Sequence, residues 1–342
     1  MLRIIVPVIG LLLIIATGAI TFPRMSVEYS IECSNCHINP SGGSMRTEFG
    51  NYSVALNEFC LPQTKDKFIK MYRSPRVSEG VTIGFDTRHL IFDNGRVFRM
   101  QTDAYVNFEP FKDFNYQLRF WENGIIENYA LFFLNDKKYF IKVGRFYPAY
   151  GLKNADHKAF NRERTGHGSN VYLDGISTGL SLNGYNFQAE VLDNFDQAIY
   201  GLHFFKTTSL DEIGLMIGGS LRLTEEIEGS NRGFPESRAI FGGVSYDRFT
   251  AMGEIDYAGQ GSDTLITYVN LTTRLEYGFY LIGEYNYFDE DRDSDNIVDE
   301  FVRLSVEVYP IPFFQLRPSY TFYTDGFMKD ETDFFLQIHF GY

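Results

Sequence analysis

The chain has 342 residues and a formal net charge of −13, and 17% of its residues are aromatic, with 33 Phe and 23 Tyr beside a single Trp. The acidic balance argues against a nucleic acid as a partner, because proteins that bind nucleic acids carry basic surfaces. No Ser/His/Asp arrangement, phosphate-binding glycine loop or zinc cluster stands out, so the sequence gives no case for a hydrolase or a transferase.

Residues 1–21 have the pattern of a secretory signal peptide. Arg3 supplies the positive charge, an apolar run follows from residue 4 to residue 15, and small residues at 17–19 offer a cleavage site. An uncleaved membrane anchor is the alternative, because the apolar run is close to the lower limit for crossing a bilayer. We favour a cleaved signal and therefore an exported protein.

The sequence Cys33-Ser-Asn-Cys36-His37 follows soon after this signal and matches the CxxCH pattern of c-type haem attachment. In such sites two thiols bond to the haem vinyl groups, and the adjacent His is the proximal iron ligand. The motif therefore predicts one covalent haem c on Cys33 and Cys36 with His37 on the iron. A structural disulfide or a metal-binding pair remains an alternative, but neither explains His37 as well.

Residues 22–77 do not show the hairpin pattern of the rest of the chain. They hold the CxxCH motif, a glycine-rich turn at Ser41-Gly42-Gly43, and a mixed, partly helical stretch from 45 to 71. The segment is too short for a large core of its own, and a haem is a large apolar body that it can wrap. We interpret 22–77 as a small cytochrome-like plug within or beneath a barrel. Cys60 has no functional explanation.

From residue 78 to residue 342 the sequence breaks into segments of strand length separated by turn residues. Alternate joins are short, whereas most of the joins between them are longer and more polar, as in membrane barrels with short periplasmic turns and long outer loops. We predict an all-β fold, a transmembrane antiparallel β-barrel of about 16 strands. The expected strands span residues 79–92, 96–109, 114–123, 127–135, 138–148, 173–183, 185–193, 197–207, 211–224, 237–246, 248–258, 264–275, 278–288, 299–309, 313–324 and 331–342.

The C-terminal segment alternates strictly. Phe334, Leu336, Ile338 and Phe340 share one face, and His339 lies on the other with polar neighbours. This alternation, ending on an aromatic residue, resembles the terminal strand of Gram-negative outer-membrane barrels.

The order of export signal, single CxxCH motif, short segment and barrel resembles the fused monohaem cytochrome–porins of the bacterial outer membrane, of the iron-oxidising type. The specific residue matches are Cys33, Cys36 and His37. The resemblance implies an outer-membrane location, with the haem segment on the periplasmic side or within the barrel, and electron transfer through one haem. It also implies three partners: a periplasmic c-type cytochrome, an extracellular small redox species or metal ion such as Fe(II), and outer-membrane lipid.

The sequence does not decide which residue is the second ligand of the haem iron. Met45 is near in sequence, and His339 is expected to face the lumen near the periplasmic end; His203 is a weaker candidate of the same kind. The longest loop, 149–172, carries His157 and His167. If it folds inward, either histidine becomes a candidate ligand or donor-binding group, and if it stays outside it is an ordinary surface loop.

Three functions are compatible with these patterns. The first is an electron-transfer cytochrome–porin, and the second is a diffusion porin whose haem is structural, sensory or absent. The third is a haem enzyme, which needs an open iron position with donor groups above it. No such groups are evident, so we expect the first function.

Overall fold

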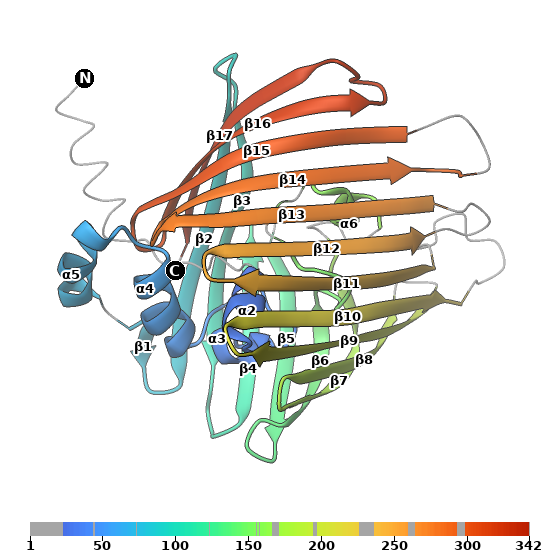
Figure 1. Ribbon diagram of the computed structural model, residues 1–342. Helices are drawn as coiled ribbons and strands as arrows, with labels where there is room; N and C mark the ends of the chain where they lie inside the picture. Colours follow the sequence, from blue (N-terminus) through green and yellow to red (C-terminus); the bar gives the residue numbers. More distant parts are fainter. Residues whose placement is uncertain are drawn as a thin grey trace.

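The computed structural model describes residues 23–341 apart from 44, 73, 123, 155, 157, 166–170, 194–196, 226–235, 259–263 and 293–297. Sixteen long antiparallel strands form the body of the molecule (Figure 1). Their bounds are β2 (Val81–Phe92), β3 (Val97–Phe108), β4 (Phe114–Trp121), β5 (Gly124–Leu134), β6 (Tyr139–Phe146), β7 (Leu173–Leu182), β8 (Tyr185–Asp193), β9 (Ala198–Leu210), β10 (Ile213–Thr224), β11 (Ser237–Tyr246), β12 (Phe249–Ala258), β13 (Thr264–Glu276), β14 (Phe279–Asp289), β15 (Val298–Ile311), β16 (Phe314–Asp325) and β17 (Thr332–Gly341).

The sheet closes on itself. Each strand from β2 to β16 pairs with the next along the chain, and β17 returns to pair with β2, where Phe340 lies opposite Thr87. A short strand, β1 (Arg76–Ser78), adds to the start of β2. The predicted fold class is confirmed as a closed barrel of sixteen antiparallel strands, and the expected strands match the observed ones to within a few residues.

The two faces of the strands differ in chemistry. On β9, Tyr200, Leu202 and Phe204 are exposed on the outer surface, whereas His203 and Phe205 are buried on the inner one. Large apolar side chains dominate the exposed outer positions around the barrel, and many inward-facing positions carry buried polar or charged groups. This arrangement, apolar outside and polar inside, is the pattern of a barrel that faces lipid.

The joins between strands differ at the two ends of the barrel. One end has tight turns such as Asn183-Gly184, where both residues have positive φ (53° and 78°). Two-residue hairpin turns that match the right-handed twist of the strands require positive φ at both positions when they are of type I′. The other end carries most of the longer joins, including those between β6 and β7 and between β10 and β11. We call these the short-turn end and the long-loop end.

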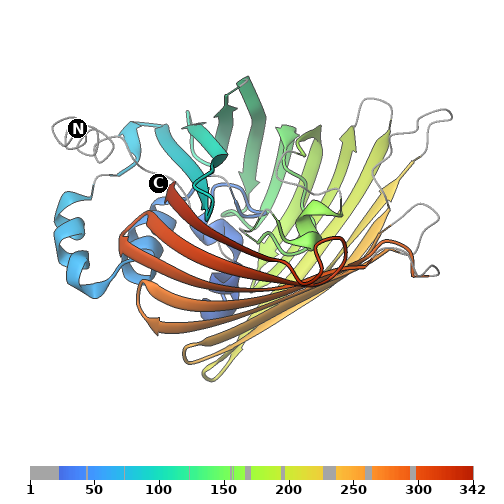
Figure 2. The ribbon, with the colours of Figure 1, turned by 90° about the horizontal axis from the view of Figure 1, so that it is seen from above.

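The N-terminal segment is helical and enters the barrel at the short-turn end. It contains α2 (Arg24–Tyr29), α3 (Cys33–Cys36), a π-helical stretch η1 (Phe49–Ala55), α4 (Leu56–Glu58) and α5 (Pro62–Met71). Figures 1 and 2 show α2 and α3 within the barrel and α5 outside its rim, and α2 contacts β9, β10, β11 and β12. From here on we use the name plug for residues 23–61, a shorter range than the predicted segment 22–77. No helix among the described residues is long and apolar enough to cross a membrane.

The join between β6 and β7 also folds into the barrel, so we call residues 147–172 the lumen loop. Its short helix α6 (Phe160–Glu163) contacts β12, β13 and β14, and Leu152 and Ala159 are buried. Of the two alternatives for this loop, the inward one is therefore observed. The predicted signal peptide, His157 and His167 lie outside the described residues.

Candidate haem site

The CxxCH motif forms one helical turn that is held from both sides. The His37 amide donates a hydrogen bond to the Cys33 carbonyl (2.9 Å), and the Thr47 amide donates to the Cys36 carbonyl (2.9 Å). A bridge between His37 and Arg46 folds the glycine-rich turn back over the motif. The two thiols and the imidazole therefore project from one rigid, compact loop.

Glycines permit this close packing. Gly42 has φ +77°, and a Cβ placed there would lie 3.5 Å from Cys33 Sγ. Gly50, at the start of η1, packs directly on the Cys36 carbonyl, and any Cβ at position 50 would overlap that oxygen. The motif helix and η1 are thus in backbone contact, which only glycine allows at this point.

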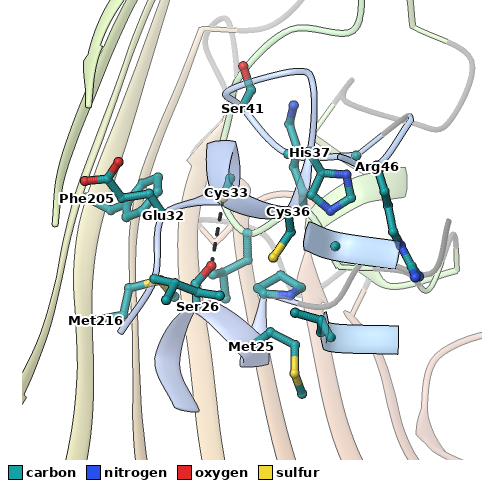
Figure 3. A pocket seen from close by; sticks show the side chains of 18 of the residues that line it. Met25, Ser26, Glu32, Cys33, Cys36, His37, Ser41, Arg46, Phe205 and Met216 are labelled. Carbon is teal, nitrogen blue, oxygen red and sulfur yellow. Dashed lines mark hydrogen bonds between the residues drawn. The ribbon is translucent and has the colours of Figure 1, made fainter. Parts of the chain in front are cut away.

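Cys33, Cys36 and His37 line one cavity of about 810 Å³, part of which is open to solvent (Figure 3). The cavity is bounded by the plug on one side and by the barrel wall and lumen loop on the other. Lining residues from outside the motif include Met25, Ser26, Glu32, Ser41, Arg46, Lys153, His203, Phe205, Met216 and Phe241.

Both cysteines of the motif are free thiols. The pKa values of these thiols help to distinguish a dithiol redox site from other CxxC sites. Burial raises the pKa of the Cys33 thiol, and raises that of Cys36 to about 11. Dithiol redox motifs have the opposite property, because their attacking cysteine is acidic. The electrostatics of this site therefore do not favour thiol–disulfide chemistry.

The wall of the cavity opposite the motif is apolar and aromatic. Phe205, Met216 and Phe241 on β9, β10 and β11 form one buried cluster with Val27 of α2, and Cys33 packs against it. An apolar wall of this kind suits a flat macrocycle and excludes water from it.

Two buried cations also reach the cavity. Burial lowers the pKa of Arg46 to about 10, and burial with the nearby Lys142 lowers that of Lys153 to about 8. The Lys153 ammonium has no hydrogen-bond acceptor among the described residues, although it lies 5.1 Å from the centre of the Tyr147 ring. A buried cation with no acceptor is costly, so this position favours an anionic group in the cavity.

The residues present fit a c-type haem: two thiols at the attachment spacing, an adjacent histidine, an apolar wall and a buried ammonium for the carboxylates of a haem. The sequence alone pointed to the motif and the glycine turn. It did not point to Phe205 or Phe241, which reach the cavity only through the closure of the barrel, and it marked Lys153 only as a charged residue of the loop 149–172. The alternation of side chains along β9, which places Phe205 on the same face as His203, was the one sequence pattern that could have indicated Phe205.

The other candidate ligands take different positions. Met45 is buried and is not among the residues that line the cavity. His339 faces the lumen as expected, but its Nε2 lies 3.0 Å from Asp86 Oδ1 and 3.2 Å from Arg88 Nε, in a separate polar cluster. His203 does line the cavity. Cys60 is buried and lies 3.2 Å from the Thr64 hydroxyl, away from the motif.

Ionic and polar contacts hold the plug in the barrel. Arg24 of α2 forms a buried ion pair with Glu307 of β15 (3.0 Å), and its guanidinium lies 4.2 Å from the centre of the Tyr280 ring. On the opposite side, Glu32 accepts hydrogen bonds from the Ser181 hydroxyl and from the Gly184 amide (3.1 Å). The CxxCH motif thus lies in a segment that is anchored to two different parts of the barrel wall.

Comparisons with known proteins agree with this fold. OmpT of Vibrio cholerae, described as expressed in the outer membrane, superposes with a TM-score of 0.59 at 12% identity, over 79% of this chain and all of that one. A mutant porin of Rh. blastica gives a TM-score of 0.55 at 11% identity, over 77% of this chain and all of that one. No protein-family model and no curated protein matches the sequence. The class defined by the fold is therefore the porin-like β-barrel.

Proposed function

We propose that this protein is an outer-membrane barrel that carries one covalent c-type haem in its lumen. In this role it transfers electrons between an extracellular donor or acceptor, such as Fe(II), and a periplasmic c-type cytochrome. The observation that supports this most directly is the meeting of Cys33, Cys36 and His37 in one cavity inside the barrel. A haem supplies one-electron redox chemistry when it is bound there.

The chain's own residues have separable roles in this proposal. Cys33 and Cys36 attach the macrocycle, and His37 binds the iron from the motif side. Phe205 and Phe241 cover its apolar surface, and Lys153 compensates a carboxylate. Because the lining is apolar and enclosed by the barrel, water is excluded from much of the cavity, which is a means by which proteins set a redox potential.

The position of the cavity suits transfer across a membrane. The hydrocarbon layer of a bilayer is about 30 Å thick, too far for direct transfer between carriers on its two sides. The apolar outer surface of the barrel faces lipid, and by the rule of short periplasmic turns the short-turn end is periplasmic. The motif then lies within reach of a periplasmic cytochrome, while the lumen leads towards the outside.

A haem stain on a denaturing gel of the outer-membrane fraction tests the proposal. We expect the wild-type band to stain, and Cys36→Ala to lose most or all of the stain. Cys60→Ala is the matched control, because Cys60 is buried but outside the cavity, and it should stain as wild type. A wild-type band that is present in that fraction and does not stain refutes the proposal.

A diffusion porin is the second candidate, because the barrel resembles that of the Rh. blastica porin. In that case solute uptake into proteoliposomes is independent of the cysteines. We expect slow uptake instead, since both the plug and the lumen loop occupy the barrel interior. Rapid uptake that is equal in wild type and Cys36→Ala supports the porin.

A further inference from the structure

We propose that His203 of β9 is the distal axial ligand of the haem iron, opposite His37. This inference rests on the proposed haem function and adds a ligand that the motif does not contain. His203 and His37 line the same cavity from opposite sides, one from the barrel wall and one from the plug. A sixth ligand from the wall therefore fastens the haem, and with it the plug, to the barrel.

The imidazole of His203 is held in one orientation by three neighbours. It stacks on Phe241 with 5.4 Å between ring centres and an interplanar angle of 16°, and it meets Phe205 edge-on at 5.6 Å. Its Nδ1 lies 2.8 Å from the Ser220 hydroxyl. A ring fixed in this way loses little further freedom when it binds a metal, so it is preorganised as a ligand.

The hydrogen bond to Ser220 has the arrangement of a metal-binding histidine. Ser220 is the direct cross-strand partner of His203 on β10, and its hydroxyl also accepts a hydrogen bond from the Gly151 amide of the lumen loop (2.9 Å). If Nδ1 donates to this oxygen, Nε2 carries a lone pair. Metal-binding histidines are usually oriented by such a partner on the other ring nitrogen.

The second ring nitrogen is available to the cavity. Within the described part of the chain, the hydrogen bond to Ser220 is the one that the His203 ring makes, and it uses Nδ1 rather than Nε2. Met25 and Met216 also line the cavity, but each thioether packs in a buried apolar cluster. Of the candidate ligands around the cavity outside the motif, His203 is the one whose side chain is held by a hydrogen bond and two ring contacts while its Nε2 takes no part in that hydrogen bond.

Spectroscopy of the haem-loaded, purified full chain in detergent tests the assignment independently of activity. The variants are His203→Ala and His203→Met, with His339→Gln as a matched control for a buried lumen histidine outside the cavity. Absorption and electron paramagnetic resonance spectra report the ligands and spin state of the ferric haem. A haem stain run in parallel reports attachment alone.

We expect wild type and His339→Gln to give the low-spin spectrum of an iron with two histidine ligands. His203→Ala should lose that spectrum and become high-spin, and added imidazole should restore it. His203→Met should show the charge-transfer band of a methionine-bound iron and a raised midpoint potential, because Met raises the potential relative to His. If His203→Ala does not fold, the electron paramagnetic resonance spectrum of the wild type and the spectra of His203→Met decide the question.

The possible failures are distinguishable. A wild type without covalent haem refutes the proposed function. A wild type that stains but has high-spin or methionine-bound iron refutes the assignment of His203 and leaves the haem function standing. The same holds if His203→Ala stains and keeps the wild-type low-spin spectrum.

Discussion

Replacing Arg24 by Met should release the plug from the barrel without unfolding the barrel. Arg24 is 2% exposed and pairs with Glu307, which is fully buried. Met keeps much of the side-chain volume and its contact with the Tyr280 ring but removes the charge. Glu307 is then a buried carboxylate that has lost its closest cation, and undocking the plug gives it access to water.

The size of the effect follows from the surroundings of Glu307. Breaking a buried ion pair by removing one partner costs about 3–5 kcal/mol. Here the Tyr309 hydroxyl still donates to Glu307 (3.3 Å), and Arg317 remains 4.0 Å away, so we expect the lower end of that range, about 3 kcal/mol. That corresponds to about a 150-fold shift in the equilibrium between docked and undocked plug.

Hydrogen exchange measured by mass spectrometry, on the protein in detergent, follows this equilibrium. Peptides covering 24–29 should exchange faster in Arg24→Met by up to that factor, while peptides from β12 and β13 stay protected. Arg76→Met is the matched control, because its pair with Glu109 is about half exposed and such pairs contribute little.

A double variant separates the charge from the packing. Arg24→Met with Glu307→Gln removes both charges, so much of the protection of 24–29 should return if the unpaired carboxylate is the cause. Unchanged exchange in Arg24→Met, or effects of the two changes that simply add, would refute this account of the anchor.

Three further predictions concern packing and the thiols. Gly151→Ala should displace the lumen loop and increase single-channel conductance, because Gly151 has φ +52° and a Cβ there would overlap the Glu254 carboxylate. Gly253→Ala is the control, because a Cβ at position 253 has room, and it should leave conductance unchanged. Gly50→Ala should lower the haem stain per barrel severalfold, since its methyl group displaces η1 from the motif; an unchanged stain contradicts that contact. In haem-free protein, a pKa of about 11 keeps Cys36 protonated at neutral pH. Its alkylation at pH 8, followed by mass spectrometry, should therefore be about tenfold to a hundredfold slower than that of an exposed cysteine. The rate of alkylation should rise with pH until about pH 11, and a plateau near pH 9 contradicts this prediction.

The barrel was predictable because its information is local. Alternation along β17 separates Phe334, Leu336 and Phe340 from His339, and the observed burial follows that pattern. Turn chemistry marked the hairpins, as at Asn183-Gly184. Each strand pairs with a neighbour in sequence, so the strand count and the register needed no long-range information except at the closing pair of β17 with β2.

The interior was predictable only in part, because its contacts join distant parts of the chain. Arg24 and Glu307 are 283 positions apart, and nothing in either neighbourhood marks the other. The motif indicated Cys33, Cys36 and His37, but the choice among Met45, His339 and His203 depends on which strands face the plug. That is decided by barrel closure, which the hydrophobic pattern does not encode.

The enclosure of the motif also constrains how the protein is made. Cys33 packs against the buried cluster of Phe205, Met216 and Phe241 inside a ring of sixteen strands, and the thiols line a cavity that is only partly open. An enzyme that attaches a cofactor to both thiols needs the motif on an accessible, extended peptide. We therefore expect the attachment of a haem to precede closure of the seam between β17 and β2. On the proposed function, biogenesis then has a fixed order, and a barrel that closes before attachment should remain without haem.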